Sequence, residues 1–71
     1  MYIERVLVVN DEPGVRKSLE EMVRQHRRSV LSVETRKAAE TALSKDVFDL
    51  VFLSSHLSDG EGKDVLKYLN D

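Results

Sequence analysis

Two short polar segments carry the side chains best suited to chemistry in this chain. Residues Asn10–Glu12 follow one apolar run, and residues Ser54–His56 follow another. Carboxylate and carbonyl oxygens are ligands for hard cations such as Mg²⁺, and a serine hydroxyl can act as a nucleophile where a base activates it. These segments could therefore bind a cation or accept a transferred group, provided that the fold brings them together.

Three apolar runs are the elements that would position these segments. Val6–Val9 and Leu50–Leu53 are apolar throughout, which is typical of strands buried on both faces of a parallel sheet. Val30–Val33 alternates in part, which is more typical of an edge strand. The polar segments directly follow the first and third runs, so both are expected at strand ends.

The residues after the first strand have the spacing of an amphipathic helix. Pro13 suits the first helical position, and the helix is expected to end near His26. Either Asp11 or Glu12 is expected to accept hydrogen bonds from the first N–H groups. The apolar side of this helix is predicted to consist of Val15, Leu19, Met22 and Val23.

Two further helices are predicted. Thr35 can cap a short helix whose inward side is made mainly of small residues, namely Ala38, Ala39, Ala42 and Leu43. Residues 54–62 are polar and glycine-bearing, so they are predicted to form a loop in which Asp59 and Glu61 are solvated. Lys63–Asn70 is predicted as the last helix, with Val65, Leu66 and Leu69 at helical spacing.

The alternation of strand and helix predicts an α/β fold with parallel strands and right-handed crossovers. In doubly wound sheets, ligands bind at the carboxyl ends of strands where the strand order reverses. With a strand order of 2-1-3, this crevice lies between the first and third strands. Asn10–Glu12 and Ser54–His56 are then expected on its two sides.

Two segments of the chain resemble receiver domains of bacterial two-component response regulators. Residues 6–16 read VLVVNDEPGVR, where the family usually has ILVVDDEPxxR, and residues 49–62 read DLVFLSSHLSDGEG, where it usually has DLVLLDLxLPDxDG. The likeness covers essentially the whole chain but only about the first three-fifths of the family's domain. It implies that residues 1–71 form a single partial domain, the (βα)3 half of a flavodoxin-like receiver fold.

The resemblance also implies a site at which an aspartate accepts a phosphoryl group beside Mg²⁺. Carried over, the metal-binding acidic pair falls on Asn10 and Asp11, the acceptor falls on Ser54, and a metal-binding backbone carbonyl falls on His56. The family's phosphate-reading hydroxyl and lysine, from the fourth and fifth strands, have no counterpart here.

These departures predict a degenerate site. An amide and a hydroxyl replace two carboxylates, which lowers the affinity for Mg²⁺ and relieves repulsion between crowded charges. We expect no bound cofactor, with Asp11 as the best candidate for any weak Mg²⁺ contact. Ser54 is not expected to be phosphorylated, and His56 is expected to be an ordinary loop histidine.

Composition excludes several other classes of function. The chain has 71 residues, no cysteine and a net charge of −2, so it can form neither a disulfide nor a zinc–thiolate site. The short basic segment 24–28 ends a helix, where positive charge suits the macrodipole, and no nucleic-acid binding is expected. No apolar run approaches membrane-spanning length and no signal-peptide pattern is present, so a cytoplasmic protein is expected.

The preferred function is that of a non-phosphorylatable receiver-like module that acts by protein–protein interaction in two-component signalling or transcription regulation, and not as an enzyme. A histidine kinase or an output domain is the expected kind of partner. Self-association through the Leu50–Leu53 edge and the open helix faces is also expected, because an apolar strand at an open edge invites pairing. Two alternatives stay open: a fragment or mutant of an active phosphoacceptor receiver, and a structural half-domain that dimerises.

Overall fold

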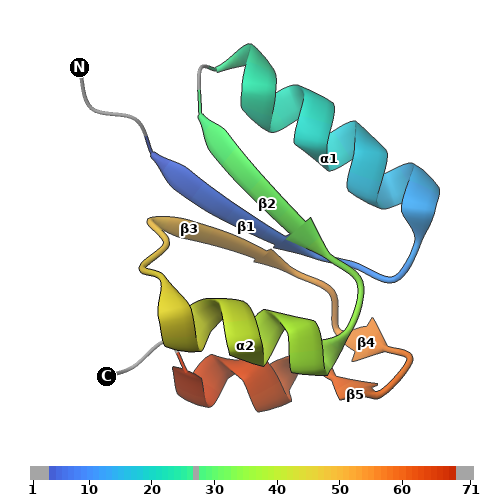
Figure 1. Cartoon of the computed structure of the whole chain (residues 1–71). Helices are drawn as coiled ribbons and strands as arrows, with labels where there is room; N and C mark the ends of the chain where they lie inside the picture. Colours follow the sequence, from blue (N-terminus) through green and yellow to red (C-terminus); the bar gives the residue numbers. More distant parts are fainter. Residues whose placement is uncertain (1–3, 27, 69–71) are drawn as a thin grey trace.

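The computed structural model describes residues 4–26 and 28–68, and its centre is a three-stranded parallel sheet (Figure 1). Strands β1 (Arg5–Val9), β2 (Ser29–Val33) and β3 (Leu50–Leu53) lie in the order β2-β1-β3. The register pairs Val9 with both Val33 and Leu53, so the three strands end at the same level. The predicted parallel sheet of order 2-1-3 is confirmed.

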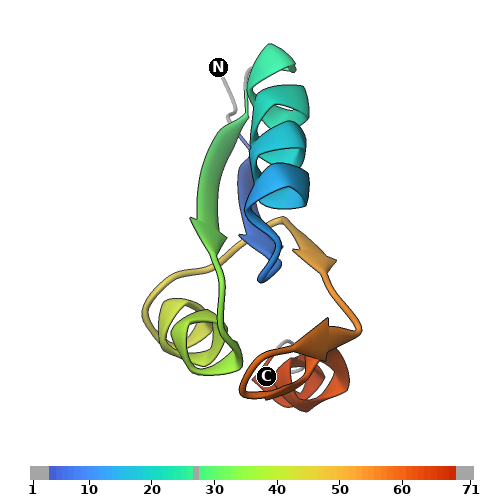
Figure 2. The same cartoon turned by 90° about the vertical axis from the view of Figure 1, so that its right-hand side faces the viewer.

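Helices cover both faces of the sheet (Figure 2). Helix α1 (Pro13–Gln25) lies on one face, and helix α2 (Arg36–Lys45) lies on the other beside a 3-10 helix, η1 (Gly62–Tyr68). As predicted, the hydroxyl oxygen of Thr35 caps α2 by accepting a hydrogen bond from the backbone N–H of Ala38 at 3.0 Å.

The central strand forms the core because its side chains alternate between the two helical layers. Val6 and Val8 pack with Val23 of α1. Leu7 and Val9 pack on the opposite face with a cluster that contains Ala39, Ala42, Leu57 and Val65. All four of these β1 residues are at most 1 % exposed, which agrees with the prediction of a strand buried on both faces.

The apolar side of α1 is only partly buried. Val23 is 2 % exposed and Leu19 packs against the core, whereas Val15 and Met22 are 44 % and 43 % exposed. The predicted apolar side of α1 therefore meets the core at Leu19 and Val23 and is exposed at Val15 and Met22. Helix α1 packs along β1 and β2, and Leu19 and Val23 lie on the side that meets them.

The segment after β3 is more ordered than predicted. The expected loop of residues 54–62 contains an antiparallel hairpin of β4 (His56–Leu57) and β5 (Gly60–Glu61). The hairpin forms because Leu57 inserts into the core, where it is 7 % exposed, and because Gly60, directly after the turn, adopts a positive φ of 156°. The last helix is a 3-10 helix rather than an α-helix, and the predicted Leu69 and Asn70 lie outside the described residues.

The basic segment 24–28 includes position 27, which also lies outside the described residues. Two other arginines of this segment form ion pairs. Arg24 lies 3.5 Å from Glu20 and Arg28 lies 2.6 Å from Glu4, measured between guanidinium nitrogen and carboxylate oxygen. None of the helices in residues 4–26 and 28–68 is long and apolar enough to cross a membrane.

Candidate functional site

The two predicted polar segments meet at the carboxyl end of the sheet. The backbone N–H of Asn10 donates to the carbonyl of Val33 at 3.1 Å, and the N–H of Ser54 donates to the carbonyl of Val9 at 3.0 Å. These bonds extend the sheet ladder by one residue and fix Asn10 and Ser54 just beyond the ends of β1 and β3. The structure therefore brings Asn10 and Ser54, one from each predicted side of the crevice, to the same edge of the sheet.

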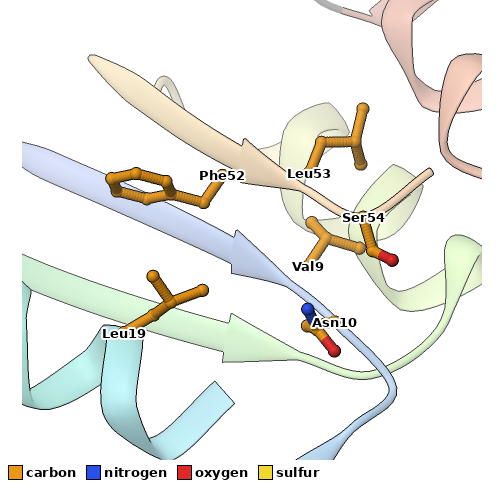
Figure 3. Close-up of a pocket in the computed structure, with 6 residues that line it drawn as sticks. All are labelled: Val9, Asn10, Leu19, Phe52, Leu53 and Ser54. Carbon is orange, nitrogen blue, oxygen red and sulfur yellow. The ribbon is translucent and has the colours of Figure 1, made fainter. Parts of the chain in front are cut away.

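A small cavity of about 170 Å³ opens between these residues and α1 (Figure 3). Its wall is mostly apolar and its polar lining comes from Asn10 and Ser54. The cavity is lined by Val9, Asn10, Leu19, Phe52, Leu53 and Ser54. In Figure 3, Asn10 and Ser54 lie beyond the strand ends, whereas Phe52 lies further back on β3 and Leu19 comes from α1.

The side chain of Asn10 organises the loop between β1 and α1. Its carbonyl oxygen Oδ1 accepts a hydrogen bond from the backbone N–H of Glu12 at 2.8 Å, which closes an Asx turn. The expectation that Asp11 or Glu12 caps α1 was wrong: Glu12 is the N-cap residue but its side chain makes no capping hydrogen bond, and Asp11 is exposed. Asn10, which stands where the family has an acid, thus shapes the loop through its side-chain amide.

The Asn10 loop is also held from the side of α1. Arg16 donates from Nη1 to the backbone carbonyl of Asn10 at 3.0 Å. The same Nη1 lies 3.5 Å from Oε2 of Glu34, which follows β2. Arg16 therefore connects the loop after β1 to the residues that precede α2.

On the other side of the crevice, the hydroxyl of Ser54 is engaged within its own loop. Oγ of Ser54 donates to the backbone carbonyl of His56 at 2.9 Å. His56 begins β4 and is exposed. The hydroxyl proton of Ser54 is thus directed at the carbonyl that the family resemblance assigns to the metal.

Gly62 keeps the chain close to Ser54. A Cβ atom at position 62 would lie 1.9 Å from the carbonyl oxygen of Ser54, a distance that no side chain tolerates. The N–H of Gly62 donates to the carbonyl of Ser55 at 3.0 Å. The return of the chain to the end of β3 therefore requires glycine at this position.

Asp59 has a role that sequence reasoning missed. Its carboxylate accepts hydrogen bonds from the backbone N–H groups of Arg36 at 2.7 Å and Lys37 at 3.1 Å, at the first turn of α2. These bonds, chiefly the one from Arg36, lower the pKa of the Asp59 carboxyl below its ordinary value of 3.8. The predicted solvation of Asp59 was therefore incomplete, since the exposed carboxylate is also a hydrogen-bond acceptor for a distant helix.

The residues at this crevice differ from the magnesium site that the resemblance implies. Position 10, where the family has a carboxylate, carries the amide of Asn10, whose oxygen accepts a hydrogen bond from the Glu12 N–H. The backbone carbonyl of His56, which the resemblance assigns as a metal ligand, accepts the hydrogen bond of the Ser54 hydroxyl. Within residues 4–26 and 28–68, no three His, Asp or Glu residues converge closely enough to hold a metal ion. The loops instead satisfy their polar groups with one another.

Comparison with known proteins places this chain and its fold in a family. The model of the response regulator receiver domain matches residues 6–71. The response regulator protein PilR of Pseudomonas aeruginosa is 32 % identical over 69 residues, which are 97 % of this chain and 16 % of PilR. The alginate biosynthesis transcriptional regulatory protein AlgB of Pseudomonas putida is 36 % identical over 62 residues, which are 87 % of this chain and 14 % of AlgB.

Among solved structures, the non-phosphorylated HemR receiver domain from Leptospira biflexa is 34 % identical and superimposes with a TM-score of 0.83. The match covers 90 % of this chain and 52 % of the HemR chain, so the present chain spans about half of that receiver structure. The motifs, the sheet order and the family match agree, and the chain belongs to the response regulator receiver domain family.

Proposed function

We propose that this receiver domain acts by binding other proteins and that it takes no phosphoryl group at position 54. The observation that carries the proposal is the hydrogen bond from Ser54 Oγ to the His56 carbonyl at 2.9 Å. A carboxylate at this position would be ionised and nucleophilic at neutral pH, whereas a serine hydroxyl needs a base to take its proton. A peptide carbonyl accepts the hydrogen bond but is not such a base.

The residues at the position of the family's acidic pair, Asn10 and Asp11, support the same proposal. Phosphoryl transfer depends on positive charge that offsets the charge of the phosphoryl oxygens. Asn10 contributes a neutral amide in place of a carboxylate, and Asp11 is the remaining acid of the family pair. One exposed carboxylate is a poor basis for Mg²⁺ binding, because this ion is usually held by one or two carboxylates together with substrate phosphates.

The proposed role is a binding module of two-component signalling or transcription regulation, and not an enzyme, in the cytoplasm. Receiver domains are signalling modules, and the relatives include a response regulator protein and a transcriptional regulatory protein. A histidine kinase or an output domain is the proposed partner. In this role the crevice is a binding surface whose shape does not depend on phosphorylation.

A magnesium titration followed by NMR tests the state of the crevice. We expect the amide signals of Asn10, Asp11 and Glu12 in the wild-type chain to show no saturable shift at millimolar Mg²⁺. The double variant Asn10→Asp/Ser54→Asp restores both carboxylates and is expected to shift and saturate. A saturable site in the wild-type chain at millimolar concentration or tighter would contradict the proposal.

A second candidate function is self-association through β3. The described residues pair one edge of β3 with β1 and place no strand on the other edge, and Leu50 on that strand is 39 % exposed. Open apolar strands favour pairing with a second chain. The chain spans 16 % of PilR and 14 % of AlgB, and the alternative that it is a fragment of a longer response regulator is compatible with this open edge.

A further inference from the structure

We infer that Asp59 is a positioning residue that holds the rim of the crevice carrying His56 against the first turn of α2. The inference concerns the geometry of the rim, and it holds whether or not Ser54 accepts a phosphoryl group. The contact differs from a local helix cap, because Asp59 lies 23 residues from Arg36 and 22 residues from Lys37 in the chain.

The first turn of α2 takes its acceptors from two sources. Thr35, the local N-cap residue, accepts the hydrogen bond of the Ala38 N–H. The N–H groups of Arg36 and Lys37, which have no acceptor within the helix, are both bound by the carboxylate of Asp59. The positive end of the helix dipole adds to this attraction for a negative charge.

The side chain of Arg36 extends the same contact. Its Nε donates to the backbone carbonyl of Asp59 at 3.2 Å, while Nη1 lies 2.7 Å from Oε2 of Glu40 and is held there. A Cβ atom at Gly60 would come within 2.7 Å of the Arg36 side chain, so the hairpin turn lies directly on this arginine. Three hydrogen bonds therefore join Asp59, in the turn between β4 and β5, to the first turn of α2.

The contacts of Asp59 fix the turn of the hairpin, and Leu57, which pairs with Gly60 beside that turn, is buried in the core. His56, whose carbonyl accepts the Ser54 hydroxyl, precedes Leu57 in β4 and pairs with Glu61 across the hairpin. Because the hairpin has only two residues in each strand, its few internal contacts are marginal by themselves. The position of the His56 carbonyl thus depends on where Asp59 docks the turn.

The other rim of the crevice, which carries Asn10, is also connected to the start of α2. Arg16 bridges the carbonyl of Asn10 and the carboxylate of Glu34, and Glu34 directly precedes the Thr35 cap. Residues Glu34–Lys37 thereby contact both rims, one through Arg16 and the other through Asp59. The start of α2 is the common anchor of the crevice.

Amide hydrogen exchange of the chain and its variants tests this role. In Asp59→Ala, the amides of Arg36 and Lys37 lose their acceptor, and the Gly62 amide, which closes the hairpin on Ser55, is expected to exchange about fivefold faster or more. The Ser54 amide, bound to Val9 in the sheet, is expected to keep its wild-type rate. The carbonyl ¹³C signal of His56 is expected to shift as the rim moves.

Two further variants complete the test. Asp59→Asn keeps one acceptor oxygen and is expected to recover part of the Gly62 protection, whereas the control Glu61→Gln, on the same hairpin, is expected to leave Gly62 and His56 unchanged. If Asp59→Ala accelerates only Arg36 and Lys37, Asp59 is merely a cap and the inference is overturned. A uniform acceleration that includes Ser54 overturns it as well, because the rim is then not selectively released.

Discussion

The hydroxyl of Ser54 donates a hydrogen bond to the backbone carbonyl of His56 at 2.9 Å, across the turn that follows β3. In the family, the first of these positions carries the phosphoacceptor and the second contributes a metal ligand. Here the two groups satisfy each other. This contact is one of those that hold the loop after β3, and it forms without a carboxylate at position 54.

Removal of this hydrogen bond is expected to destabilise the loop modestly. Ser54→Ala should lower the free energy of unfolding by about 0.5–1 kcal/mol, since the bond is partly open to solvent. Ser54→Asp should cost more, about 1–3 kcal/mol without metal, because a carboxylate replaces the donor and faces the His56 carbonyl. Urea unfolding followed by circular dichroism measures both changes.

Ser55→Ala is the matched control for these variants, because Ser55 is the exposed neighbour on the same turn. It should leave the urea midpoint unchanged. If Ser54→Asp is as stable as the wild-type chain in the absence of metal, the hydrogen bond is not what holds the loop.

Two glycines are expected to respond in opposite directions to alanine. Gly62→Ala places a methyl group against the Ser54 carbonyl and should destabilise the chain by about 1–3 kcal/mol or more. Gly14→Ala meets no atom within 4 Å in the first turn of α1 and should stabilise it by up to about 1 kcal/mol. Thermal unfolding of the two variants compares them directly, and equal shifts would refute the close approach at Gly62.

Acid is expected to release the hairpin before the sheet. The hydrogen bonds from Arg36 and Lys37 depress the pKa of folded Asp59 below 3.8, so its contribution to stability is complete above that pH. The contribution is lost as the pH falls through the folded pKa. An NMR titration of the Asp59 carboxyl carbon should therefore have its midpoint below 3.8, together with loss of the Gly62 amide protection. A midpoint at or above 3.8 would contradict these hydrogen bonds.

Self-association is expected to depend on the open edge of β3. The wild-type chain should sediment as a dimer at high micromolar concentration, and Leu50→Lys should shift it to the monomer, because a charged side chain blocks edge pairing. Leu31→Lys is the control, since Leu31 is 43 % exposed on the other edge strand and should not change the equilibrium. A well-folded wild-type monomer at that concentration would rule out the β3 interface.

The parts of the fold that were predictable are those that depend on repeated apolar residues. Val6–Val9 is apolar throughout because helices cover both faces of β1, and that pattern is visible without coordinates. The strand order and the meeting of Asn10 with Ser54 followed from the topology rules and the resemblance. The cap at Thr35 was also predictable, because its acceptor and donor lie three residues apart.

The parts that were missed depend on contacts between distant residues. Asp59 looked like a solvated loop acid because its partners, Arg36 and Lys37, lie in another element. The hairpin was missed because Leu57 is one apolar residue in a polar segment, and its burial is visible only after η1 and α2 are packed. Asn10 was correctly singled out as a departure from an acid, but its Asx turn depends on local geometry that residue type alone does not determine.

The most direct test of the central claim is the mass of the intact chain after incubation with acetyl phosphate and Mg²⁺. A receiver domain with aspartate at the acceptor position serves as the positive control for the reagent. We predict that the wild-type chain keeps its mass, because the Ser54 hydroxyl donates its hydrogen bond to a backbone carbonyl, which is not a base that could take its proton. A gain of one phosphoryl group, located at Ser54 by peptide fragmentation, would contradict the account.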